Sequence, residues 1–122
     1  MIDKQQINAV VDSVARSVVD DYVMPWAAAL DAEFEALGVG SDANPGTPED
    51  TMRAYRAPAV ESHVARFVHD CDDNKDLANE ALAIAGGVLA TAKVHGAGST
   101  NTMNLVMMFR NEVLRMFEDG QA

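Results

Sequence analysis

The sequence contains few of the features that hold a small protein together covalently or anchor it in a membrane. Cys71 is the single cysteine among 122 residues, so an intramolecular disulfide is impossible and a reducing compartment is expected. The longest uncharged helical stretch, residues 81–92, is well short of the ~20 apolar residues that a membrane span requires. The first residues also lack the basic stretch and apolar run of a secretion signal, so we expect a cytoplasmic protein.

Positively charged residues are scarce. There are 9 Lys and Arg against 19 Asp and Glu, a formal net charge of −10, and residues 1–40 hold 7 acids and 2 bases. Nucleic acids and anionic membranes are bound through Lys and Arg, so this charge argues against either as a direct partner and favours a protein partner with a basic surface. The same charge also promotes solubility, and a solubility or salt adaptation explains it equally well.

Patterns that indicate catalysis or a bound cofactor are missing as well. His63, His69 and Cys71 lie close in sequence, but no histidine pair is spaced four apart and no Glu-x-x-His motif occurs. The glycine-rich stretches 38–46 and 96–98 follow no strand pattern and contain no Lys-Ser or Lys-Thr pair, so they do not resemble phosphate-binding loops. We therefore expect no catalytic residue, no cofactor and no metal.

Apolar residues recur every three or four positions along most of the chain, which predicts an all-α protein. We expect one domain over residues 1–122, a compact bundle of four main helices, or five or six segments when the breaks at Pro25 and Pro58 are counted. Gly38 to Thr47 is the one clear loop, and whether it orders on binding is left open. The predicted core face of the first helix consists of Ile7, Val10, Val11, Val14, Val18 and Tyr22.

Two local signals place further helices. Thr47, Pro48 and Asp50 have the composition of a helix start, with proline at the first position and an acid in the first turn. Gly86 and Gly87 lie inside the helix expected from Leu77 to His95, where each glycine costs about 1 kcal/mol relative to alanine. Close approach of another helix would offset that cost, so we expect this helix to be the central, most buried one.

The last helix, from Met103 to Glu118, has a wider apolar arc than a single core contact needs. The arc covers roughly 200° of the helical wheel, about twice the ~100° of an ordinary surface helix. We therefore expect one side to face the core and the other to bind a partner, because methionine-rich surfaces adapt to different partners. The predicted partner interface consists of Leu105, Met108, Phe109 and Met116.

Arg110 lies within this apolar arc on the helical wheel. A buried guanidinium without a partner costs several kcal/mol, so we expect a structural ion pair. Asp21, in the apolar face of the first helix one turn before Pro25, is the predicted partner, with Glu33 as the alternative.

These features favour a non-enzymatic, acidic helical protein-interaction module. Whether it associates with itself as a homodimer is left open. Its expected role is that of an accessory or inhibitory protein that covers a basic partner surface. One alternative is a nucleic-acid mimic that uses Asp12, Asp20, Asp31 and Glu35, a row that Arg16 interrupts. Another is a small-molecule-binding bundle or enzyme, which requires a pocket with converging polar groups.

Overall fold

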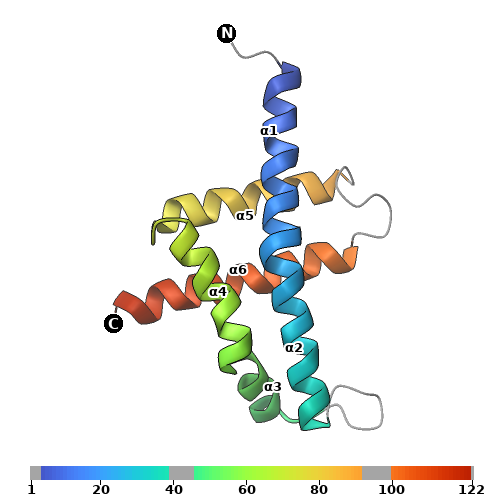
Figure 1. Ribbon diagram of the computed structural model, residues 1–122, viewed down its shortest axis with the longest axis vertical. Helices are drawn as coiled ribbons and strands as arrows, with labels where there is room; N and C mark the ends of the chain where they lie inside the picture. Colours follow the sequence, from blue (N-terminus) through green and yellow to red (C-terminus); the bar gives the residue numbers. More distant parts are fainter. Residues whose placement is uncertain (1–3, 39–45, 92–99, 122) are drawn as a thin grey trace.

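Helices occupy nearly all of the described chain, residues 4–38, 46–91 and 100–121, in the computed structural model (Figure 1). No strand occurs in these ranges, which confirms the predicted all-α class. In Figure 1 the α1–η1–α2 segment runs along the long axis, α5 and α6 cross it, and α4 lies beside α2. In chain order the elements are α1 (Lys4–Ser17), the π-helix η1 (Val18–Val23), α2 (Met24–Leu37), α3 (Pro48–Tyr55), α4 (Pro58–Asp70), α5 (Lys75–Ala90) and α6 (Thr100–Gln121).

The expected break at Pro25 takes the form of a widened helical turn. Proline has no N–H, so the main-chain carbonyl of Asp21 loses its usual intrahelical donor. The Arg66 guanidinium of α4 donates to that carbonyl instead. The Met24 N–H bonds to the Val19 carbonyl, five residues back, which is the hydrogen bond of a π-helix. α1 therefore continues through η1 into α2 without interruption, with α4 supplying the missing donor.

The core is built around aromatic rings from three helices. Trp26 of α2, Phe67 of α4 and Phe109 of α6 have exposed fractions of 0%, 2% and 0%. The Phe109 ring packs edge-on against Trp26 and Phe67, with centroid distances of 5.5 and 5.4 Å. Such edge-to-face pairs contribute beyond the apolar area that they bury. These contacts fix how α6 is rotated against α2 and α4.

The predicted helix start at Thr47 is confirmed in detail. The Thr47 hydroxyl accepts from the Asp50 N–H at 3.1 Å, and the Asp50 carboxylate accepts from the Thr47 N–H at 3.1 Å. This reciprocal capping box satisfies two main-chain donors that would otherwise have no partner. Pro48 occupies the first turn of α3, where its missing N–H costs nothing. Most of the predicted Gly38 to Thr47 loop, residues 39–45, lies outside the described residues.

The close approach of another helix that was expected at Gly86 and Gly87 is not found, although α5 is central to the fold. α5 packs against both α1 and α6, and its buried residues are Ala78, Leu82, Ala85, Val88 and Leu89. Gly87 is exposed, and a methyl group added at Gly86 or Gly87 would meet no atom within 4 Å. No other described part of the chain therefore approaches these glycines closely, and the described fold does not explain them.

Candidate functional site

The predicted partner interface on α6 is largely inside the protein. Phe109 is fully buried at the centre of the core, while Leu105, Met108 and Met116 are partly buried against it. Among the described residues of α6, Met107 is the large apolar residue that is exposed, at 60%. The assignment of Phe109 to a partner is wrong because its ring packs against Trp26 and Phe67 in the core, and α5 and α4 of the same chain both pack against α6. The wide apolar arc is thus mostly covered within the subunit.

The predicted ion pair between Arg110 and Asp21 is also absent from the described structure. Arg110 is exposed, and the Asp21 carboxylate instead accepts from the Ser17 hydroxyl at 3.1 Å. The rotation of α6 set by Phe109 turns Arg110 outward together with Met107. No burial penalty then requires a partner for this guanidinium.

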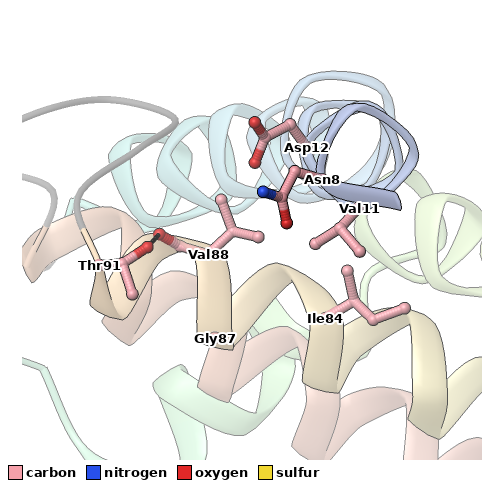
Figure 2. Close-up of a pocket in the computed structure, with 7 residues that line it drawn as sticks. All are labelled: Asn8, Val11, Asp12, Ile84, Gly87, Val88 and Thr91. Carbon is pink, nitrogen blue, oxygen red and sulfur yellow. Dashed lines mark hydrogen bonds between the residues drawn. The ribbon is translucent and has the colours of Figure 1, made fainter. Parts of the chain in front are cut away.

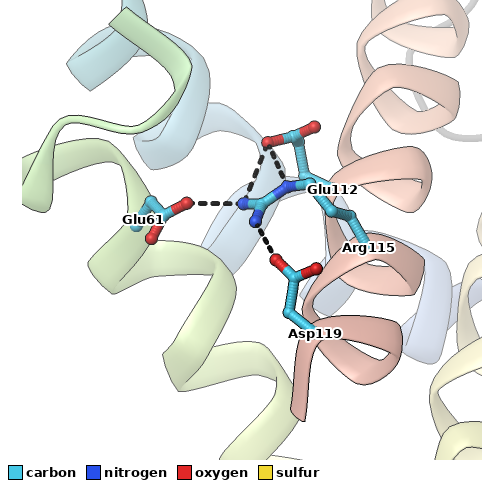
Figure 3. A network of polar contacts seen from close by, with 4 residues as sticks. All are labelled: Glu61, Glu112, Arg115 and Asp119. Atoms are coloured by element: carbon cyan, nitrogen blue, oxygen red, sulfur yellow. Dashed lines mark hydrogen bonds and ion pairs between the residues drawn. The ribbon is translucent and has the colours of Figure 1, made fainter. Parts of the chain in front are cut away.

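Arg115, five residues further on, forms the ion pairs that were expected of Arg110 (Figure 3). Its guanidinium contacts Glu61 of α4 at 2.5 Å and Asp119 at 2.9 Å. Glu112 accepts from it at 3.3 Å, and the Arg115 side chain is 20% exposed. Burial lowers the pKa of Arg115, but the charges of Glu112 and Glu61 outweigh that effect and leave the pKa above its usual value. This network joins α4 to α6.

A pocket of about 350 Å³ lies beside this network, between α3 and α6. Its walls combine an apolar side with the charged edge of the Arg115 network, and burial followed by the charge of Glu112 raises the pKa of Tyr55. The lining residues are Pro48, Thr51, Met52, Tyr55, Arg56, Glu112 and Arg115. Polar groups therefore converge on one pocket, as the small-molecule alternative requires.

The most exposed apolar stripe lies at the start of α1. In Figure 1 the first half of α1 extends past α5, away from the other helices. Residues 4–10 are all exposed, and Ile7 and Val10 reach 52% and 61%. Further along the same helical face Val14 is half-buried and Val18 is buried. The sequence indicated this stripe correctly, but the expectation that all of it is core fails because α5 crosses α1 instead of running along it, so the first half of α1 extends past the crossing (Figure 1).

A hollow of about 280 Å³ adjoins this stripe where α1 crosses α5 (Figure 2). Asn8, Val11 and Asp12 form its α1 wall. The α5 wall consists of Ile84, Gly87, Val88 and Thr91. We call the apolar part of this region the α1–α5 contact surface, which consists of Ile7, Val10 and Val11 of α1 and Ile84, Gly87 and Val88 of α5.

The described residues contain no metal-binding constellation beside these surfaces. Within the described ranges, His, Cys, Asp and Glu side chains form no group of three or more that could hold a metal ion. Burial, followed by the charges of Asp70 and Asp72, raises the pKa of the Cys71 thiol. A raised pKa keeps the thiol neutral, whereas the thiolate is the nucleophile.

None of the described helices is both long and apolar enough to cross a membrane. The chain matches no protein-family model, no curated protein and no solved structure.

Proposed function

We propose that the chain is a non-enzymatic protein-interaction module whose contact region is the α1–α5 contact surface. One observation carries the proposal: Ile7 and Val10 are more than half exposed on a part of α1 that no described helix covers. Side chains of this kind, next to a hollow with an apolar floor, are suited to receive an amphipathic helix.

The charge of the chain supports a basic partner. The net charge of −10 lowers the rate of encounter with acidic molecules and raises it with basic ones. In this proposal the apolar surface supplies most of the binding free energy and the acidic exterior guides the approach. An accessory or inhibitory protein that covers a basic surface on another protein would have these two properties.

A defined probe tests this proposal. Two synthetic amphipathic helices share a leucine face and differ in having lysine or glutamate on the polar face. We expect the lysine peptide to bind more tightly, Val10→Glu to weaken that binding at least about tenfold, and Met107→Glu to leave it unchanged. Val10 and Met107 are matched in exposure at 61% and 60%, so equal effects of the two substitutions would contradict the proposal.

The same measurement separates the proposal from a nucleic-acid mimic. If the chain is a mimic, its affinity for the lysine peptide should fall steeply as salt rises and should not depend on Val10, because the contacts are between charges. If the peptide binds through the α1–α5 contact surface, added salt should remove only the part of the affinity that is due to long-range charge attraction. A steep salt dependence combined with indifference to Val10→Glu would favour the mimic.

The pocket between α3 and α6 supports a second candidate, a small-molecule-binding bundle. Its lining includes the apolar Met52 and the charged Glu112 and Arg115, which suits a ligand with one apolar and one polar side. Thermal unfolding against a panel of metabolites tests this candidate. A ligand that stabilises the wild type and fails with Glu112→Gln would support it, and a flat panel would count against it.

A further inference from the structure

We propose that a further pocket, on the other flank of α1 from the hollow in Figure 2, binds an alkylammonium group, which is a protonated amine on an apolar stem. The pocket has a volume of about 350 Å³. α1 and η1 form one wall, and the end of α4 and the first half of α5 form the other. It shares no lining residue with the α1–α5 contact surface, so it is a site additional to that of the proposed function.

The charged end of the pocket is the carboxylate of Asp70, the last residue of α4. Its Oδ2 atom accepts from the Tyr22 hydroxyl at 2.5 Å, and a carboxylate can accept several hydrogen bonds. That hydrogen bond, followed by burial, raises the pKa of Tyr22 to about 12, and burial raises the pKa of the Cys71 thiol. Both groups are therefore neutral at neutral pH, and Asp70 carries the charge among the described residues that line the pocket.

The neighbouring hydroxyl groups present acceptors to the pocket. The Tyr22 hydroxyl gives its proton to Asp70. The Ser17 hydroxyl, which also lines the pocket, gives its proton to the Asp21 carboxylate at 3.1 Å. Toward a ligand both hydroxyls therefore offer only lone pairs. An ammonium group has three donors and no acceptor, so it matches this set, whereas an anionic ligand would be repelled by Asp70.

The rest of the lining is mostly apolar and suits the stem of the amine. Val14 and Val18 come from one wall, and Phe67 and Ala81 come from the other. Asp70 is exposed, and an exposed ion pair contributes little by itself, so a small hydrated cation would bind only weakly. An apolar stem adds the burial of several CH₂ groups. This combination favours an alkylammonium over an inorganic cation.

A neighbouring cation, Arg66, does not occupy the site. Its guanidinium lies over the Tyr22 ring, 4.7 Å from the centroid, and donates to the main-chain carbonyl of Asp21. Arg66 is not one of the residues that line the pocket. The net charge of −10 also raises the local concentration of cations around the chain. The surrounding charges therefore admit an added ammonium group.

Titration of the full chain with hexylammonium at physiological salt, followed through amide chemical shifts in NMR spectra, tests the site. We expect shifts confined to amides near the pocket, such as those of Cys71 and Ala81. Methylammonium, which lacks the stem, should bind at least about tenfold more weakly, and hexanol, which lacks the charge, about 2- to 5-fold more weakly. No binding at about 50 mM hexylammonium, or equal binding of hexanol, would overturn the proposal.

Asp70→Asn tests the carboxylate and has a matched control in Asp72→Asn. Both substitutions remove one negative charge, but Asp72 does not line the pocket. Asp72 has a φ of 58°, which asparagine tolerates, so the control retains the turn. Asp70→Asn should weaken hexylammonium binding about 2- to 5-fold, and Asp72→Asn by less than about 1.5-fold. Equal effects would mean that only the overall charge attracts the amine, and this result would overturn the site.

Filling the pocket tests the place of the stem. Ala81 lines the pocket, whereas Ala83 on the same helix is exposed and does not. Ala81→Leu should weaken hexylammonium binding at least about tenfold, and Ala83→Leu should leave it unchanged. Circular dichroism checks that both variants remain helical. Ser13→Leu, at an exposed position of the same lining, replaces Ala81→Leu if that variant does not fold, and unchanged binding in the filled variant would overturn the site.

The lysine peptide distinguishes two sources of the ammonium group, a free amine and a lysine side chain of a basic partner. Val14 continues the exposed stripe of α1 and also lines the pocket, so a helix bound along the stripe would bring its lysines near Asp70. Competition between hexylammonium and the peptide would identify a lysine side chain, and hexylammonium binding without competition would identify a free amine. Val10→Glu should leave hexylammonium binding unchanged, so failure of the proposed function and failure of this site are measured separately.

Discussion

Replacing Phe109 by alanine tests the rotation of α6, on which both corrections to the α6 predictions depend. Phe109 is fully buried and its ring contacts Trp26 and Phe67 at 5.5 and 5.4 Å. If Phe109 instead faced a partner, as the sequence suggested, its removal would cost the isolated subunit little. The structure predicts a large loss of stability.

The magnitude follows from the burial and the two ring contacts. Replacing a core phenylalanine by alanine costs about 3–5 kcal/mol of stability, and each aromatic pair contributes about 0.5–1.5 kcal/mol beyond the apolar area that it buries. We expect the loss for Phe109→Ala to be about 4 kcal/mol. A domain of this size has a stability of about 5–15 kcal/mol, so the variant should fold but be marginal.

Urea unfolding followed by circular dichroism measures this loss. The urea concentration at the midpoint should fall strongly for Phe109→Ala with an unchanged slope, and less for Phe109→Leu, which keeps part of the volume. Met107→Ala, on the exposed side of α6, should stay within about 0.5 kcal/mol of the wild type. A loss below about 1 kcal/mol for Phe109→Ala would refute the described packing of α6.

Three further predictions concern polar contacts. Arg115→Met should lower the free energy of unfolding in urea by about 1–3 kcal/mol, because Glu61 and Glu112 lose their shared donor. Arg110→Met, at an exposed position, should change it by less than about 0.5 kcal/mol. Equal effects of the two substitutions would contradict the network. Thr47→Ala should cost about 1 kcal/mol by removing the capping box of α3, and an unchanged midpoint would show that this cap does not contribute. The hydrogen bond from Tyr22 to Asp70, followed by burial, raises the pKa of Tyr22 from 10.0 to about 12. The stabilising contribution of this hydrogen bond is therefore complete below pH 10 and lost as the pH rises toward 12. In Tyr22→Phe the free energy of unfolding should lack this decrease between pH 10 and 12.

The local features of the fold could be predicted because they depend on residues near one another in sequence. Thr47 and Asp50 lie three positions apart, and their side chains reach each other as soon as α3 forms. The all-α class follows in the same way from apolar spacing within each segment. Tertiary context did not override these signals.

The side of α6 that faces the core could not be predicted from its own sequence. An apolar arc of roughly 200° can be rotated over a wide range and still present apolar residues to the core. The packing of Phe109 between Trp26 and Phe67, residues 83 and 42 positions away in the sequence, selects one rotation. That rotation turns Arg110 to the surface and places Arg115 against Glu61 of α4.

The outcome at Pro25 likewise depends on a distant residue. The sequence indicates that the Asp21 carbonyl loses its donor, and it does not show where a replacement comes from. Arg66, on α4, supplies it. The extent of α1 beyond α5 was unpredictable for a related reason, because the length of a helix does not reveal which of its turns another helix will cross.

Hydrogen–deuterium exchange of the first half of α1, measured with and without the lysine peptide, tests most directly whether its exposed stripe is a contact surface. We expect the amides of residues 4–14 to exchange fast in the free protein and to become protected when the peptide is bound, while the amides of α6 around Phe109 stay protected throughout. Fast exchange in α1 both with and without the peptide, or a peptide-dependent change confined to α6, would contradict the assignment.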